Sequence, residues 1–498
     1  MRNRLLVLGA ALAAFGASLF AGFHFDDYAI FSDPRFTGGP DWKAIWASPQ
    51  PLTDATFRLS YWMGGRDPFA YHLFSLALEL AVVALAYACL RRMVGERAGF
   101  AAALVFALHP LQAEAVNYVA ARGELLGALF GFTALLAWLR GLKWSALPWL
   151  ALALLANGYF AGLAVLMGMA GTAEAWGAGA VEQAEAPGAV LNPSLTPLRV
   201  WLGRILRLAP MGGALLLSAA AVVKLAYSMR TAHGVMAWPK YLLGEGPAIW
   251  RYLRLLVFPY GFTADPDVHV PAVWIGVLAW AALLAAAVCA WKWRRSGWTF
   301  WLLAGLALVL PGSSALAQRD LYADSRMYLP MLAFAAAAGW LLTRVKTQAL
   351  VATAAVVLAA LSVARTTVWM SDKWLWQEAV RRAPEKARPK VELSRDLPAA
   401  DALDLLARAQ AAAPHDPTIP AEMGKVLLQE RQVDPALMAF GQALALDPNN
   451  AEYFNDRGVA LAMSGWTDRA RADFQRALEI DPNLTEATEN LKKLPPAQ

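Results

Sequence analysis

Long runs of apolar residues recur through the first three quarters of this chain, far more than one soluble core could bury. Of its 498 residues, 58% are hydrophobic and 16% are charged, values outside the range of soluble proteins. They predict an all-α, polytopic membrane bundle of about eleven transmembrane helices, several of them short. The expected spans are residues 5–23, 72–90, 98–108, 125–140, 145–156, 159–172, 209–227, 272–291, 298–310, 330–343 and 348–364.

The first apolar run follows the basic start Met1-Arg2-Asn3-Arg4, as in a secretory signal peptide. The run has about 19 residues, whereas the apolar part of a signal peptide has roughly 7–15. We therefore expect a transmembrane helix here.

Basic clusters between the spans predict the topology. If Asn157-Gly158 divides residues 145–172 into two spans, all the clusters lie on one side of the membrane. The positive-inside rule assigns this side to the cytoplasm. If residues 145–172 form one undivided span, the topology after this span is inverted. The clusters are Arg2/Arg4, Arg91/Arg92/Arg97, Arg140/Lys143, Arg199/Arg204/Arg207, Lys292/Arg294/Arg295 and Arg344/Lys346. This predicts a multi-pass protein of the plasma membrane (the bacterial inner membrane), with a cytoplasmic N-terminus and residues after 365 outside, in the periplasm.

The formal net charge of +6 raises the alternative of a nucleic-acid partner. Because the basic residues lie in short clusters between apolar runs, we expect a lipid bilayer and no nucleic acid. Cys89 and Cys289 both fall inside apolar runs, which argues against a disulfide framework or a thiolate metal site.

After residue 365 the composition changes and a 34-residue repeat begins, with windows at 417–450 and 451–484 and a weaker copy at 383–416. Small residues, an aromatic residue and a closing proline match between the two windows: Gly424/Gly458, Leu427/Leu461, Ala436/Ala470, Phe440/Phe474, Ala443/Ala477 and Pro448/Pro482. This is the tetratricopeptide (TPR) pattern. We expect a transmembrane domain at 1–365, a connecting helix at 366–382, and a TPR solenoid at 383–498 with a capping helix at 485–494.

Four polar groupings fall on the expected outer side. They are Asp26/Asp27 with His24, the segment His109 to Glu114, Arg122-Gly123-Glu124, and the segment Asp324 to Pro330 with Arg326 and Tyr328. Two adjacent carboxylates beside a bilayer suit a general base or a cation ligand. The segment from 109 to 124 is expected to form an amphipathic surface helix.

Each grouping also has a purely structural interpretation. The aspartate pair can be a helix cap in a solvated loop, His109 before Pro110 can end a helix, and Glu114 can solvate a helix surface. Arg122 and Arg326 can extend to lipid headgroups. Outward carboxylates and two arginines would also serve transfer of a group from a lipid-linked phosphate.

The motifs, in order, resemble those of the transmembrane and tetratricopeptide repeat-containing O-mannosyltransferases and their bacterial relatives. The resemblance rests on Phe25-Asp26-Asp27-Tyr28, Phe69-Ala70-Tyr71-His72-Leu73, Phe106-Ala107-Leu108-His109-Pro110, Glu114-Ala115-Val116, Ala121-Arg122-Gly123-Glu124-Leu125-Leu126, Pro311-Gly312-Ser313-Ser314 and Ser325-Arg326-Met327-Tyr328-Leu329-Pro330. It implies a GT-C type glycosyltransferase with a polyprenyl-phosphate sugar, such as mannose, as donor and protein Ser or Thr as acceptor.

On this resemblance Asp26 or Asp27 is the catalytic base of an inverting displacement, and Arg122 and Arg326 bind the donor phosphate. His24, His109, Glu114, Glu124 and Tyr328 are expected to contact substrate. The sequence identifies no cofactor with certainty, and Asp26 and Asp27 are candidate ligands for a divalent cation, Mg²⁺ or Mn²⁺. The TPR domain is expected to bind the polypeptide acceptor or a protein partner.

Two other functions fit the same features. One is a non-catalytic TPR scaffold for envelope assembly, which Asn157-Gly158 favours because the family is expected to carry a Lys-Glu pair at that place. The other is a polymerase or ligase of surface polysaccharide, which would use a similar lipid donor.

Overall fold

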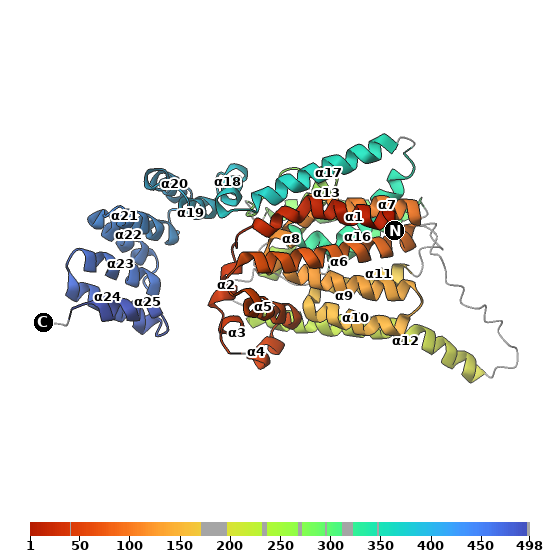
Figure 1. Cartoon of the computed structure of the whole chain (residues 1–498), viewed down its shortest axis with the longest axis horizontal. Coiled ribbons are helices and arrows are strands. Elements are labelled where there is room, and N and C mark those ends of the chain that lie inside the picture. Colours follow the sequence, from red (N-terminus) through yellow and green to blue (C-terminus); the bar gives the residue numbers. More distant parts are fainter. Residues whose placement is uncertain are drawn as a thin grey trace. The chain divides into compact units, whose positions relative to one another are not determined.

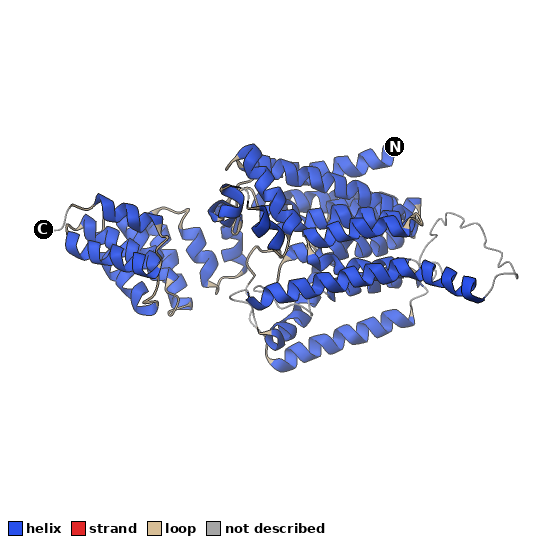
Figure 2. Ribbon diagram, turned by 90° about the horizontal axis from the view of Figure 1, so that it is seen from below, coloured by secondary structure: helices blue, strands red, loops and turns tan. Residues whose placement is uncertain are grey.

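A computed structural model of the chain describes residues 1–39, 41–170, 197–231, 237–266, 271–293, 296–310, 322–345 and 348–495, with only the backbone described at 197–207 and 229–231. Every regular element in these residues is a helix (Figure 2). The predicted all-α class is therefore confirmed. The motif residues 311–314 and the basic residues Arg294, Arg295 and Lys346 lie outside the described residues.

The chain divides into two compact units. The first comprises Met1–Phe262 and Val268–Ser371, and the second comprises Thr263–Asp267 and Asp372–Gln498. In the first unit, α1, α6, α9, α10 and α12 pack in a row, each against the next, and α7, α16 and α15 form a second series that contacts α6 (Figure 1). The helices of this unit are α1 Arg2–Phe15, η1 Gly16–Phe20, α2 Asp27–Ser32, α3 Pro34–Thr37, α4 Trp42–Ala47, α5 Pro51–Gly64, α6 Pro68–Val94, α7 Glu96–Leu108, η2 Pro110–Gln112, α8 Ala113–Asn117, η3 Val119–Ala121, α9 Arg122–Leu139, α10 Lys143–Ala156, η4 Gly158–Gly162, α11 Leu163–Ala170, α12 Pro197–Thr231, α13 Trp238–Val257, α14 Val273–Lys292, α15 Trp298–Leu310, η8 Asp324–Met327, α16 Tyr328–Leu342 and α17 Gln348–Val368.

Several helices of this unit are long and apolar enough to cross a bilayer, as expected of a multi-pass membrane protein. Among the described residues there are six: Arg2–Phe20, Pro68–Val94, Val119–Leu139, Leu208–Ser228, Val273–Lys292 and Ala349–Val368. The pair Glu96–Leu108 and Pro110–Asn117, bent by 49°, makes a seventh if it is one span. The predicted count of about eleven is not reached, because helices such as α10, with 14 residues, and α15, with 13, are shorter than the roughly 20 residues that a span needs.

The division at Asn157 is present in the structure. α10 ends at Ala156, and Asn157 is extended at φ −154° and ψ 111°. Its side-chain oxygen accepts a hydrogen bond from the main-chain N–H of Tyr159 at 3.0 Å and so begins η4. The expected break between two apolar helices therefore has a local cause.

The predicted amphipathic surface helix between His109 and Glu124 is wrong. The segment instead forms η2, α8 and η3 before α9 begins, because His109 and Tyr118 have extended main chains and Pro110 lacks an N–H. The apolar side chains that were expected to lie on a membrane surface are at most 1% exposed: Leu111, Ala115, Val116 and Val119. The segment is therefore part of the interior of the first unit.

The second unit contains a solenoid of helix pairs followed by one more helix. Its helices are α18 Asp372–Arg382, α19 Ala387–Ser394, α20 Ala399–Ala412, α21 Thr418–Gln429, α22 Val433–Leu446, α23 Ala451–Met463, α24 Thr467–Ile480 and α25 Thr485–Lys493. A Cβ atom added at Gly424 or Gly458 would lie 2.6 Å from the ring of Phe440 or Phe474. The repeated glycine therefore lets the two helices of a repeat approach each other, and the repeated phenylalanine fills the space between them.

Candidate functional site

The loop after η1 carries the two adjacent aspartates, and a strained turn directs them to opposite environments. Phe25 has a φ of +47°, which is uncommon for a residue with a side chain. Asp26 is exposed, whereas Asp27, the first residue of α2, is fully buried. The two carboxylates are therefore not equivalent.

Both oxygens of Asp27 accept main-chain hydrogen bonds. Oδ2 accepts the N–H of His24 at 3.0 Å, and Oδ1 accepts the N–H of Ala120 at 2.7 Å. Burial raises the pKa of Asp27 to about 7, although these N–H groups oppose the rise. Asp27 therefore joins the first loop to η3, which directly precedes α9, and its pKa lies near neutral pH.

Aromatic side chains surround the exposed carboxylate. The main-chain N–H of Asp26 donates to the hydroxyl of Tyr118 at 3.2 Å, and the Tyr118 ring stacks on Trp369 with centroids 5.8 Å apart. His24 is buried behind them, with Nε2 2.6 Å from the carbonyl oxygen of Trp369. His24 thus anchors the loop, and Asp26 is the acidic group that solvent reaches.

Arg122 is a buried cation at the start of α9. It is 0% exposed, and its guanidinium donates to Ser60 Oγ at 2.9 Å and to the main-chain oxygens of Thr56 and Tyr71 at 3.2 Å each. It also lies 4.9 Å from the ring centroid of Phe74. Within the described residues no carboxylate forms a direct ion pair with Arg122, so its direct contacts are with neutral groups, and the charge of Asp27 acts on it from a greater distance.

Arg326 lies in η8 and takes part in a second polar group. It pairs with Glu245 of α13 at 3.3 Å and lines a small cavity of about 20 Å³, together with Glu124, Tyr159 and Tyr252. The structure therefore brings two predicted residues, Arg326 and Glu124, to one cavity whose wall is otherwise largely apolar and aromatic.

Glu114 holds the other end of η8. Its Oε2 accepts the main-chain N–H of Asp324 at 3.0 Å, and the Asp324 carboxylate pairs with Arg251 of α13 at 2.7 Å. Tyr252 accepts the N–H of Ala323 through its hydroxyl at 3.0 Å. These contacts position the segment that carries Arg326.

Tyr328 donates a hydrogen bond to a carboxylate that the sequence analysis missed. Its partner is Glu79, a fully buried residue in the middle of α6. The second oxygen of Glu79 has no hydrogen-bond partner among the described residues. One carboxylate inside an otherwise apolar span was a usable signal, because ionisable residues in membrane helices are usually functional. Glu245 and Arg251, both in α13, were also missed.

His109 is a structural residue in this arrangement. Its Nδ1 accepts the N–H of Leu111 at 3.2 Å, and Nε2 lies 3.3 Å from the carbonyl oxygen of Leu256. The site residues thus form one group around Asp26, Asp27 and His24 and another around η8. The segment from Glu114 to Glu124 contributes to both.

The aspartate pair does not fit a divalent cation. Both oxygens of Asp27 already accept main-chain hydrogen bonds. In the part of the chain that the structure describes, no three His, Cys, Asp or Glu side chains lie close enough to hold a metal ion. The divalent cation remains a prediction from the sequence.

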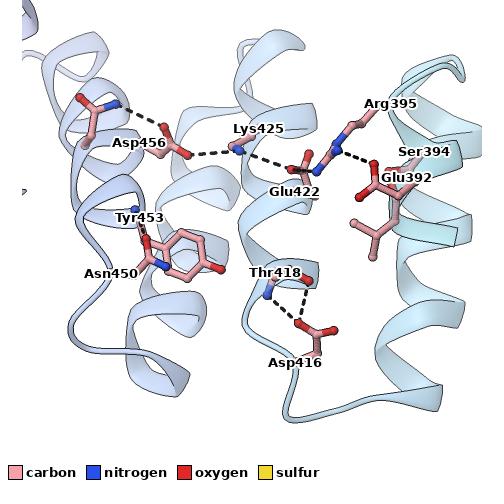
Figure 3. Close-up of polar contacts among 12 residues, drawn as sticks. Glu392, Ser394, Arg395, Asp416, Thr418, Glu422, Lys425, Asn450, Tyr453 and Asp456 are labelled. Atoms are coloured by element: carbon pink, nitrogen blue, oxygen red, sulfur yellow. Dashed lines mark hydrogen bonds and ion pairs between the residues drawn. The ribbon is translucent and has the colours of Figure 1, made fainter. Parts of the chain in front are cut away.

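The second unit carries a ladder of charged side chains on the first helices of its repeats (Figure 3). Glu422 of α21 accepts from Arg395 at 2.8 Å and from Lys425 at 3.3 Å, and Lys425 reaches Asp456 of α23 at 3.6 Å. Arg395 also pairs with Glu392 of α19 at 2.5 Å. We call Glu392, Arg395, Glu422, Lys425 and Asp456 the charged ladder. It links three successive repeats.

Comparison with known proteins finds one repeat family and several O-mannosyl-transferase relatives. Residues 451–484 match the family model described as tetratricopeptide repeat. Protein O-mannosyl-transferase TMTC3 of Homo sapiens is 31% identical over 151 residues, covering 27% of this chain and 16% of the relative. Protein O-mannosyl-transferase TMTC1 of Mus musculus is 31% identical over 156 residues, covering 28% of this chain and 17% of the relative.

The predicted resemblance is confirmed as partial homology to these O-mannosyltransferases together with a TPR repeat. The matched stretch spans about one sixth of the relatives' length. Among solved structures, the first TPR of Spaghetti (RPAP3) bound to an HSP90 peptide is 25% identical and covers 22% of this chain and 92% of its own. Its TM-score is 0.22, so this likeness does not support a shared fold or function.

Proposed function

We propose that this protein is a membrane glycosyltransferase that moves a sugar, a hexose such as mannose, from a polyprenyl phosphate to Ser or Thr of an extracytoplasmic protein. The observation that carries the proposal is the partial homology to protein O-mannosyltransferases. The buried Arg122, which has no anionic protein partner among the described residues, supports a role in binding an anionic substrate.

The reaction is an inverting displacement. The acceptor hydroxyl oxygen bonds to the anomeric carbon while the bond from that carbon to the phosphate oxygen breaks. The lipid phosphate leaves with the electron pair, and the hydroxyl proton passes to Asp26, which is the exposed member of the pair. Asp27 positions the loop through its bonds to His24 and Ala120.

The donor phosphate is bound by Arg122 and Arg326, whose positive charges stabilise the leaving group. Glu124 and Tyr159 line the same small cavity as Arg326 and contact the sugar when this cavity widens to admit it. Glu114 positions η8 through its hydrogen bond to the main chain of Asp324. Tyr328 is held in place by its hydrogen bond to Glu79.

The bundle belongs to the GT-C type in this proposal. The shorter helices α10, α11, α15 and α16 complete about eleven spans, which neighbouring helices make tolerable by covering their ends. The N-terminus is cytoplasmic and the TPR domain at 383–498 is periplasmic, where it binds the polypeptide acceptor.

The test is the intact mass of envelope and secreted proteins from cells with the wild-type gene, without it, and with Asp26→Asn. A hexose-sized mass lost from one protein in both altered strains supports the proposal. Asp67→Asn is the matched control, because this exposed residue caps α6 through its bond to Phe69 N–H and asparagine caps equally well. Unchanged protein masses would favour the scaffold, and a shortened surface polysaccharide would favour the polymerase or ligase.

A further inference from the structure

The ends of α1, α6 and α9 surround a pocket that the proposed reaction does not use. Its volume is about 640 Å³, and its wall comes from these three helices and the residues next to their ends. It lies at the end of α6 that carries Arg91 and Arg92, whereas the aspartate loop follows η1, after the opposite end of α1. The pocket therefore needs an explanation of its own.

Positive charge gathers at this pocket. Arg4 of α1, Arg91 and Arg92 of α6, and Arg140 of α9 all line it, and no carboxylate does. Arg91 pairs with Glu96 at 3.1 Å. Among the described residues the other three arginines form no ion pair. Ordinary snorkelling spreads arginines over a helix surface, but here three separate helices direct them to one hollow.

Further along α6 from the arginines, towards its N-terminus, the pocket is lined mainly by alanine and leucine. Ala81, Ala84 and Ala88 recur along one face of α6, and Leu85 and Leu136 complete the wall. From Arg91 to Ala81 the helix rises about 15 Å, which is half of the roughly 30 Å hydrocarbon thickness. Because α6 is a candidate membrane span, the pocket would extend from the headgroup level to about the middle of the bilayer.

We propose that this pocket binds one anionic phospholipid. The phosphate of the lipid contacts Arg4, Arg92 and Arg140, and one of its acyl chains lies along Ala81, Ala84 and Ala88. Charge complementarity selects the occupant, because a zwitterionic headgroup would bring its own cation to the arginines. A transmembrane helix of another protein would fill the apolar part and leave the charges unmatched.

The test uses the purified full-length chain in a non-ionic detergent. Retained lipid is counted by native mass spectrometry after addition of dioleoylphosphatidylglycerol, dioleoylphosphatidylcholine or glycerol phosphate. We expect one retained phosphatidylglycerol, at least tenfold weaker retention of phosphatidylcholine, and no competition by glycerol phosphate. Equal retention of both lipids, or competition by glycerol phosphate, would overturn the proposal.

Two sets of variants locate the site. Arg92→Gln with Arg140→Gln should lower phosphatidylglycerol affinity at least tenfold. The matched control, Arg2→Gln with Arg97→Gln, removes the same charge from exposed residues outside the pocket and should bind as the wild type does. Ala84→Phe keeps every arginine but fills the path of the acyl chain, so it should also lose the lipid. Wild-type binding by Ala84→Phe and by the arginine variant would exclude this pocket.

Discussion

Asp26 and Asp27 are neighbours in sequence but differ in burial, and this difference assigns them different roles. Replacing Asp26 by asparagine should lower the rate of sugar transfer by about 10²-fold or more, the usual effect of removing a general base. The Tm of the variant should change little, because Asp26 is exposed, its main-chain bond to Tyr118 is retained, and the asparagine side chain can still accept a hydrogen bond from the Tyr118 hydroxyl. Radiolabelled sugar transfer by the purified protein measures the rate, with Asp67→Asn as control. Full activity of Asp26→Asn would remove it from the catalytic machinery.

The pKa of Asp27 predicts how stability depends on pH. Burial raises this pKa from 3.8 in the unfolded chain to about 7 in the folded one, so the folded state binds the proton more tightly. The stabilisation is therefore fully present below pH 3.8 and is lost as pH rises towards 7.

We expect the Tm of the detergent-solubilised protein to fall by about 5 °C between pH 5 and pH 8 from this residue alone. Asp27→Asn should remove that part of the pH dependence, and it should lower the Tm at pH 5 because an amide cannot accept both N–H bonds. Differential scanning fluorimetry of both proteins across this range measures the difference. Identical pH profiles would show that Asp27 does not titrate as described.

The sequence identified most of the polar residues of the site but not their partners. Asp27 was selected because two carboxylates are adjacent, yet its bonds to His24 and Ala120 depend on a turn at Phe25 that no pattern signals. Glu79 meets Tyr328 across 249 residues of sequence. Such pairs come from tertiary packing, which the pattern of a single sequence does not specify.

Packing between the two helices of a repeat makes a prediction at the level of the element. Gly458→Ala would place a Cβ atom 2.6 Å from the ring of Phe474, and the overpacking should cost about 1–3 kcal/mol. Gly441→Ala is the matched control, because no side-chain or distant backbone atom lies within 4 Å of its added Cβ. It should be neutral or stabilise α22 by up to about 1 kcal/mol.

Hydrogen exchange of the full-length protein, followed by mass spectrometry, measures these effects. Peptides from α23 and α24 should exchange faster in Gly458→Ala and at the wild-type rate or slower in Gly441→Ala. Unchanged exchange in Gly458→Ala would mean that α23 and α24 can separate at little cost.

Element type was easier to predict than element boundary. Apolar runs became helices such as α6 and α14, and Asn157 ended α10 where expected. The segment from His109 to Tyr118 was predicted incorrectly because its apolar spacing also suits a helix lying on a membrane. Its two extended residues and its burial were decided by the surrounding bundle.

At the scale of the whole molecule, the proposed function assigns the chemistry to the membrane bundle and the choice of acceptor to the repeat solenoid. The candidate catalytic residues belong to the first unit, and the charged ladder belongs to the second. Variants of the ladder should therefore impair transfer to a folded protein acceptor and leave transfer to a short Ser-containing peptide unchanged.

Arg395→Gln with Lys425→Gln tests this separation. Both side chains are about half exposed, and glutamine still donates a hydrogen bond to Glu422, so the solenoid should stay folded. Loss of two charge-assisted contacts with an acceptor, each worth about 1.5–3 kcal/mol, should raise KM for the protein acceptor at least tenfold with little change in kcat. Arg408→Gln with Arg476→Gln, on the second helices α20 and α24, removes equal charge and should have no effect.

Equal losses for peptide and protein acceptors would mean that the repeats act on the catalytic bundle itself, because substrate selection alone cannot slow the reaction of a peptide that never contacts them.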